Sequence, residues 1–289
     1  MKKVAVGIAV VLGLTLLSPA VAETKPSIAI IDTAIDTTLP ALQGKIIHEA
    51  CVMQSKGCPN KQMIQEGPGS ASLPTSQLYA NGFDHGTIMA LIATQVNPDI
   101  NIVFIRIVPM APSGIQSQYT ESSVLSALEW VAQNKQKFNI VATSASIGHH
   151  SLRPGANYCP VKANLRDSIV KLQSLNVATI FAAGNNYDIS RVDYPACITE
   201  SIAVGSATRE GRIALHSNGG KELDFYALGS FETTVKNAVG TSAATAAFAS
   251  YWVKNYKGSY SSTYEYLKSL SKPTESEQIK SNNFIDILK

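Results

Sequence analysis

The chain has 289 residues, of which 45% are hydrophobic and 16% are charged. Its 24 basic and 21 acidic residues nearly balance, and without the first 22 residues, which include two lysines, the basic count is 24 − 2 = 22. A net charge this close to zero gives no reason to expect nucleic acid or an anionic membrane as a partner.

The first 22 residues have the pattern of a signal peptide. Two lysines precede a 14-residue apolar run at 4–17, and Ala20-Val21-Ala22 forms a small-residue cleavage site. The alternative, a transmembrane anchor, is disfavoured because the run is too short to cross a bilayer. We therefore expect a signal peptide at 1–22, one domain at 23–289, and an exported protein, periplasmic or extracellular, with no membrane partner.

The four cysteines suit an exported protein. They are even in number, so disulfides are expected, although four cysteines allow three pairings. We favour Cys51–Cys58, whose six intervening residues close a local loop easily, and hence Cys159–Cys197. Zinc is the alternative, but no Cys-x2-Cys pair supports it.

Apolar runs that alternate with helical patterns extend through the chain. Strands are predicted at 27–31, 45–53, 101–108, 139–146, 177–183 and 201–205, and helices at 84–96, 120–135, 161–176, 240–253 and 263–270. Residues 57–74 are predicted to be an irregular loop, 223–226 and 233–236 to be antiparallel or marginal strands, and a short element to end at Leu288. This alternation predicts an α/β fold with a central, mostly parallel sheet flanked by helices on both faces, a three-layer sandwich.

Polar residues far apart in the chain are predicted to meet at one rim of this sheet. Asp32, Gly148 and Asn185 follow predicted strands, and His85 and Ser242 begin predicted helices. Ligands of such sheets bind at the carboxyl ends of the strands.

Each of these residues has a simpler explanation by itself. Ser242 could cap its helix, Asp32 or Asn185 could occupy a turn, and His85 could cap the helix that it begins. Together they supply a nucleophile, a base, an orienting acid and an oxyanion donor, the groups that acyl transfer needs.

Five motifs at these positions resemble those of the subtilisin-like serine proteases (subtilases, peptidase family S8). The runs occur in that family's order and span the whole of 23–289. They are Ile31-Asp32-Thr33-Ala34-Ile35-Asp36, His85-Gly86-Thr87, Ser146-Ile147-Gly148, Ala182-Ala183-Gly184-Asn185 and Gly240-Thr241-Ser242-Ala243-Ala244-Thr245.

The resemblance implies a subtilisin-like fold, a polypeptide substrate and a role for each motif. Asp32 is expected to orient His85, His85 to take the proton of Ser242, and Ser242 to attack the peptide carbonyl. The Asn185 side chain and the Ser242 backbone N–H are expected to hold the oxyanion. The substrate-binding segments are implied to be Ser146, Ile147 and Gly148, which pair with the substrate backbone, and Ala182, Ala183 and Gly184, which complete the walls of the specificity pocket.

The chain departs from the family pattern at several points. Ala34 stands where the family usually has Gly, and Ala243 and Ala246 replace a Met and a Pro of the serine motif. No pro-segment is evident after Ala22, so we expect unaided folding or a separate folding helper or inhibitor, and a monomer. No cofactor is implied to be required. Structural calcium is common in the family, but no acidic loop of this sequence can be assigned to it.

Two local features bear on specificity. In relatives the segment before Tyr-Pro forms the floor of the pocket, and here it carries Asp193, which we predict to favour Lys or Arg before the scissile bond. The alternatives are that Arg191 neutralises Asp193 or that Asp193 points to solvent. His149-His150 is interpreted as a loop at the cleft edge rather than a metal site, because no further ligand stands at suitable spacing.

The leading interpretation is thus an exported serine endopeptidase. Its main alternative is a catalytically silent homologue that binds peptides in the same cleft. An α/β-hydrolase esterase is excluded, because Ala244 follows Ser242 where that fold needs Gly and because the order here is Asp, His, Ser.

Overall fold

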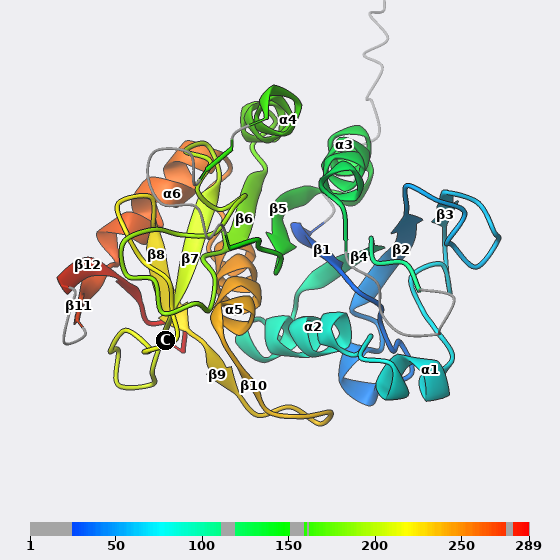
Figure 1. Ribbon diagram of the computed structural model, residues 1–289, viewed down its shortest axis with the longest axis horizontal. Coiled ribbons are helices and arrows are strands. Elements are labelled where there is room, and N and C mark those ends of the chain that lie inside the picture. Colours follow the sequence, from blue (N-terminus) through cyan, green and yellow to red (C-terminus); the bar gives the residue numbers. More distant parts are fainter. Residues whose placement is uncertain (1–24, 111–118, 151–158, 161, 276–279, 289) are drawn as a thin grey trace, which may run out of the picture.

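Ten strands form one central sheet whose carboxyl edge carries the predicted site (Figure 1). The computed structural model describes residues 25–110, 119–150, 159–160, 162–275 and 280–288, so the predicted signal peptide lies outside the described residues. The strands are β1 (Ser27–Asp32), β2 (Ile46–Val52), β3 (Ile64–Glu66), β4 (Asn101–Arg106), β5 (Ile140–Ala145), β6 (Ala178–Ala182), β7 (Ile202–Ala207), β8 (Phe225–Leu228), β11 (Lys272–Glu275) and β12 (Lys280–Ile285).

The order of the strands is β11-β12-β8-β7-β6-β5-β1-β4-β2-β3. The strands from β12 to β2 run parallel, and only the edge strands β11 and β3 are antiparallel to their neighbours. After β1, the chain first adds β2 and β4 on one side of β1. It then adds β5 and the later strands on the other side. The order therefore reverses beside β1, which is where open α/β sheets form their ligand sites.

Helices cover both faces of the sheet, which confirms the three-layer prediction. In Figure 1, α3 and α4 lie on one face and α2 and α5 on the other. The helices are α1 (Thr75–Ala80), α2 (His85–Val96), α3 (Glu121–Phe138), α4 (Ala163–Ser174), α5 (Thr241–Lys254) and α6 (Tyr260–Ser269), with a short 3-10 turn at Pro40–Leu42. Among the described residues, no helix combines the length and apolarity needed to cross a membrane.

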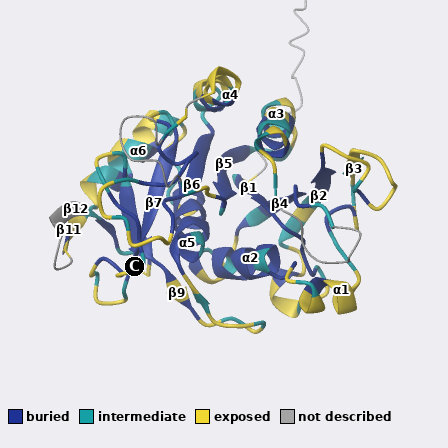
Figure 2. Cartoon of the chain, viewed as in Figure 1, coloured by how far each residue is buried: buried dark blue, intermediate teal, exposed yellow. Residues whose placement is uncertain are grey.

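Both faces of β1 are buried, which explains its continuous apolar run. Ile28 and Ile30 pack in the core under α2 and α5, whereas Ala29 and Ile31 pack in the core under α3 and α4. Figure 2 shows that α5 is buried along its length while α3 and α4 expose their outer sides. Helix α5 can lie so deep because its alanines let the backbone approach the sheet closely.

The structure corrects several of the predicted elements. The stretch 57–74 contains β3, and α1 follows it, so it is less irregular than predicted. Residues 233–236 are not a strand but part of the turn between β9 (Ser230–Phe231) and β10 (Ala238–Val239). β8 pairs parallel to β7 rather than antiparallel. The reason is that the chain crosses back to the same end of the sheet before each of these strands begins. The predicted C-terminal element is β12, which joins the main sheet beside β8.

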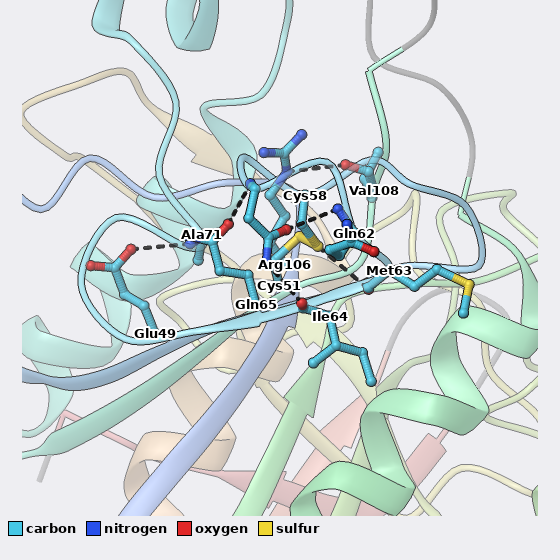
Figure 3. Close-up of a disulfide and its surroundings, with 11 residues drawn as sticks. Glu49, Cys51, Cys58, Gln62, Met63, Ile64, Gln65, Ala71, Arg106 and Val108 are labelled. Atoms are coloured by element: carbon cyan, nitrogen blue, oxygen red, sulfur yellow. Dashed lines mark hydrogen bonds between the residues drawn. A yellow bond between two sulfur atoms is a disulfide. The ribbon is translucent and has the colours of Figure 1, made fainter.

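Two disulfides join loops to the domain, with the pairing that the sequence favours. Cys51 bonds Cys58 across a separation of 7 residues, next to the edge of the sheet (Figure 3), and Cys159 bonds Cys197 across 38 residues. No free cysteine occurs in the described part of the chain. On the chain-entropy account, the cross-link that closes the longer loop restricts the unfolded chain more.

Removing the two disulfides should therefore have unequal effects on stability. We expect the double variant Cys159→Ala/Cys197→Ala to lose about 4 kcal/mol in the free energy of unfolding, and Cys51→Ala/Cys58→Ala about 2 kcal/mol. Urea unfolding of each variant and of the wild type measures both losses. An equal or larger loss for the Cys51–Cys58 variant would contradict the loop-length argument.

Candidate active site

Asp32 ends β1 at the point where the strand order reverses. Its side chain is 3% exposed, and its Oδ1 accepts hydrogen bonds from the Thr33 N–H at 2.7 Å and from His85 Nδ1 at 2.8 Å. A carboxylate can only accept, so the imidazole proton lies on Nδ1 and the lone pair of Nε2 faces away from Asp32. That arrangement makes His85 a base whose orientation is set by Asp32.

The first turn of α2 lies so close to β1 because residue 86 is glycine. A Cβ there would come within 2.5 Å of the Phe104 ring and 2.8 Å of the Ala34 carbonyl oxygen. Thr33 fixes the same approach, since its hydroxyl donates to Phe83 O at 2.8 Å and accepts from the Gly86 N–H at 2.9 Å. The position of His85 thus follows from close backbone packing around Asp32.

Ser242 is the second residue of α5, which begins directly after β10. Its N–H therefore has no partner inside the helix, and it lies at the positive end of the helix dipole. Gly240 precedes the helix with φ +145°, a conformation that favours glycine, and a Cβ there would lie 3.2 Å from Asn185 Oδ1. Among the described residues no hydrogen bond joins the Ser242 hydroxyl to His85, as is common before substrate binds.

Asn185 follows β6 and is held by Thr241, the neighbour of Ser242. Its Oδ1 accepts from the Thr241 N–H at 2.9 Å and from the Thr241 hydroxyl at 3.2 Å, and that hydroxyl in turn accepts from the Gly184 N–H at 3.2 Å. Two donors on Oδ1 determine which end of the amide is which. The exposed Asn185 side chain therefore directs its NH2 group outward, beside the start of α5.

The two predicted substrate-binding segments meet at Asp193. Its backbone N–H donates to Ala183 O at 2.8 Å, and a Cβ on Gly184 or Gly148 would lie 2.3 Å or 3.3 Å from the Asp193 side chain. Ser146 extends the same edge toward the serine, because its hydroxyl donates to Ser242 O at 3.1 Å. A cavity of about 650 Å³ is lined in part by Ile147, Gly148 and His149.

Asp193 is buried and partnered, which differs from both alternatives considered above. It is 6% exposed, so it does not point to solvent, and its Oδ1 bonds His150 Nδ1 at 2.8 Å and Asn218 Nδ2 at 2.9 Å. Arg191 forms an ion pair with Asp188 at 2.6 Å. Burial raises the pKa of Asp193, and the hydrogen bond to His150 works against that rise.

His149 and His150 serve the cleft edge in different ways. The backbone of His149 pairs with Tyr194 as a short antiparallel bridge, while the His150 side chain turns to Asp193. Within the described ranges, no three His, Cys, Asp or Glu side chains are grouped so as to hold a metal ion.

The electrostatics around His85 extend to the β9–β10 hairpin. Desolvation lowers the pKa of His85, but the charge of Asp32 and its hydrogen bond outweigh this, so the pKa lies above its ordinary value of 6.5. Lys236, on the hairpin turn, pairs with Asp84 at 2.8 Å and lowers the same pKa by its charge.

Among the residues that support the site without a predicted role are Gly86, Lys236, Thr241 and Asn218. Gly86 and Thr241 lie inside the motifs, beside His85 and Ser242, and could have been found there. Lys236 and Asn218 lie outside the motifs, and only the folded chain brings them to Asp84 and Asp193.

Comparison with known proteins agrees with this geometry. A model of the subtilase family matches residues 23–275, so the chain belongs to that family. It is 25% identical over 206 residues to the major intracellular serine protease of Bacillus subtilis (strain 168), covering 70% of this chain and 57% of that protein. It is 24% identical over 234 residues to thermitase of Thermoactinomyces vulgaris, covering 75% of this chain and 70% of thermitase.

Solved structures support the fold. A cold-adapted subtilisin-like serine proteinase superposes with a TM-score of 0.66 at 23% identity, over 91% of this chain and 88% of the other. The chain thus spans little more than half the length of the Bacillus relative but most of this proteinase domain.

The pH dependence of the site should respond to Lys236. If neutral His85 is the working base, activity falls as the pH drops through its raised pKa, so the acidic limb of kcat/KM lies above pH 6.5. Lys236→Met removes a charge that lowers this pKa, and the limb should move to higher pH.

A pH profile of kcat/KM on a peptide amide measures the shift. Lys254→Met is the control, because Lys254 ends α5, about 20 Å along the helix from Ser242, and should leave the limb unchanged. A limb that stays in place or moves to lower pH in Lys236→Met would show that Lys236 does not act on His85.

Proposed function

We propose that this chain is a serine endopeptidase that cleaves polypeptides through an acyl-enzyme. The observation that carries the proposal is the Asp32–His85 hydrogen bond of 2.8 Å at the sheet edge where α5 presents Ser242. Membership in the subtilase family supports the same chemistry.

The first step is nucleophilic attack. Nε2 of His85 takes the proton of the Ser242 hydroxyl as Oγ bonds to the scissile carbonyl carbon, and Asp32 stabilises the imidazolium that forms. The carbonyl oxygen becomes an oxyanion, and the outward NH2 of Asn185 and the N–H of Ser242 donate to it.

The intermediate then collapses in two stages. His85 returns its proton to the leaving amine, the C–N bond breaks, and an ester remains on Ser242. A water molecule, deprotonated by His85, attacks the ester and releases the acid, after which the serine regains its proton. Protein groups alone carry these steps, and no cofactor takes part in the proposal.

The edge formed by residues 146–148 supports an extended peptide as the substrate. Such an edge offers backbone groups to a strand-like ligand, with pockets for alternate side chains. The cavity of about 650 Å³ beside Ile147 and Gly148 is in the size range of small-molecule sites, so it has room for a substrate side chain.

We extend the proposal to a preference for Lys or Arg before the scissile bond. Asp193 lies between Gly148 and Gly184, the two segments assigned to the pocket walls, and is held by His150 and Asn218. A buried carboxylate beside a pocket favours a cation there, because charge complementarity acts strongly where water is excluded.

The proposed site of action is outside the cytoplasm. Two disulfides support this, since they form and persist in oxidising compartments. The proposed working form is a monomer, with any inhibitor or folding helper supplied by a separate chain.

Labelling of the nucleophile tests the central proposal. A fluorophosphonate should modify the wild-type protein at one serine, Ser242→Ala should remain unlabelled, and Asp32→Asn should label much more slowly because His85 loses its orientation. The control Ser262→Ala, an exposed serine of α6, should label like the wild type. Folded wild-type protein without label would favour the peptide-binding homologue.

Cleavage profiling on a peptide library tests the preference. Asp193→Asn keeps the side-chain size but removes the charge, and we expect kcat/KM on substrates with Lys or Arg at that position to fall about 30-fold or more, equivalent to 2 kcal/mol. Asp167→Asn, an exposed acid on α4, should change nothing. Equal profiles for wild type and Asp193→Asn, with serine labelling intact, would refute the preference and leave the peptidase proposal standing.

A further inference from the structure

The β9–β10 hairpin brings a lysine to the end of α2 that carries His85. Lys236 Nζ lies 2.8 Å from Asp84 Oδ2, and Asp84 directly precedes His85. At the other end of the helix, Gln95 Nε2 donates to Glu232 O at 2.8 Å. The hairpin therefore runs alongside α2, from its last turn to its first (Figure 1). Whatever holds the loop of the hairpin also holds a positive charge near the imidazole.

The loop at 232–237 receives little support from its own backbone. The ladder of the hairpin ends with the pair of Ala238 and Phe231. Beyond this pair, no backbone-to-backbone hydrogen bond closes the loop in the part of the chain that the structure describes. An unsupported loop samples many conformations, so side chains must fix this one.

The Thr233 side chain provides most of that support. Its hydroxyl donates to Lys236 O at 2.8 Å, and it accepts from the N–H groups of Val235 and Lys236, each at 3.2 Å. Both backbone polar groups of Lys236 are thus bonded to one oxygen atom. A hydroxyl has one proton to donate and two lone pairs, so these three bonds use its full capacity.

The ion pair of Lys236 depends on such support because it is exposed. The Lys236 side chain is 57% exposed, and an exposed pair between a flexible lysine and a carboxylate is weak, since ordering the side chain costs entropy. A fixed backbone at residue 236 reduces the number of bonds that remain to be ordered. The time that the ammonium group spends beside Asp84 therefore depends on the loop.

We propose that Thr233 is a positioning residue for the reaction, whose hydroxyl holds the loop so that Lys236 stays against Asp84, beside His85. The inference rests on the proposed function, because it takes neutral His85 as the base. Thr233 lies outside the sequence motifs of the site, and its hydrogen bonds are to the loop itself. It acts on the chemistry through Lys236.

The charges around His85 determine the direction of the effect. Burial lowers the pKa of His85, the charges of Asp32 and Asp84 raise it, and the charge of Lys236 lowers it. When Lys236 moves away, the imidazole holds its proton more tightly and a smaller fraction is neutral at acidic pH. The acidic limb of kcat/KM then lies at higher pH, while the plateau above the limb is unchanged.

Thr233→Val tests the proposal, because it removes the hydroxyl and keeps the branched shape. We expect the limb to move to higher pH, as in Lys236→Met, so that kcat/KM on a peptide amide falls about 2- to 5-fold at a pH below the limb, the size of one exposed charge interaction. Thr233→Ser keeps the hydroxyl and should keep the wild-type limb. Thr234→Val, the same change at the next, exposed residue, should also leave it in place.

The double variant Thr233→Val/Lys236→Met shows whether Thr233 acts through Lys236. Its limb should coincide with that of Lys236→Met, because the charge that Thr233 positions is already gone. A wild-type limb in Thr233→Val, even with a lower plateau, or a further shift in the double variant, would overturn the inference. Fluorophosphonate labelling separates this result from the proposed function. A wild type that is labelled at Ser242 but whose limb ignores Thr233 refutes the positioning role alone, whereas an unlabelled wild type refutes both.

Discussion

The hydrogen bond between Asp32 and His85 depends on how closely α2 can approach the end of β1. The distance between the helix and the strand end is set by backbone packing, and the chemistry of the two side chains depends on that distance. Gly86 leaves room for the Phe104 ring and the Ala34 carbonyl, and the Thr33 hydroxyl bridges the strand end to the first turn of the helix. A side chain at residue 86 would push the helix away from the strand, and the imidazole would leave the carboxylate with it. Backbone packing therefore fixes the positions of both side chains of the acid–base pair.

The serine is tied to the same framework through α5. This helix packs on β5, β6, β7 and β8 and against α2, and the buried Ser250 hydroxyl donates to Ala93 O of α2 at 2.6 Å. His85 and Ser242 therefore stand on two helices that are joined to each other as well as to the sheet. Ala246 fits this arrangement, because it lies inside α5, where proline would remove a backbone donor. Ala34 also fits, since it is not among the described residues with positive φ.

Elements with a strong apolar pattern could be predicted from the sequence, and the sheet edge that carries Asp32, His85, Asn185 and Ser242 followed from them. What could not be predicted depends on contacts between distant segments. β3 has little apolar pattern and is ordered by pairing with β2 next to a disulfide. Residues 233–236 contain β-branched side chains, but the hairpin turns there. The direction of β8 depends on which edge the chain returns to, and the partners of Asp193 come from residues 150 and 218. Sequence spacing does not predict these contacts between distant segments.

Buried charges at the carboxyl edge show how the fold keeps ionised groups away from water. Every buried carboxylate on the described chain has a hydrogen-bond or ion-pair partner, and buried Arg106 donates to Val108 O. The acids and their partners are Asp32 with His85 and Thr33, Asp36 with Thr38 and Tyr79, Glu49 with Gly69, Ala71 and Ser72, Asp84 with Lys236, and Asp193 with His150 and Asn218. Loop backbone N–H groups satisfy several of these acids, as that of Thr33 does for Asp32 and those of Gly69 and Ala71 do for Glu49. Backbone donors at this edge likewise suit an oxyanion beside Ser242, whose own N–H lies at the start of α5.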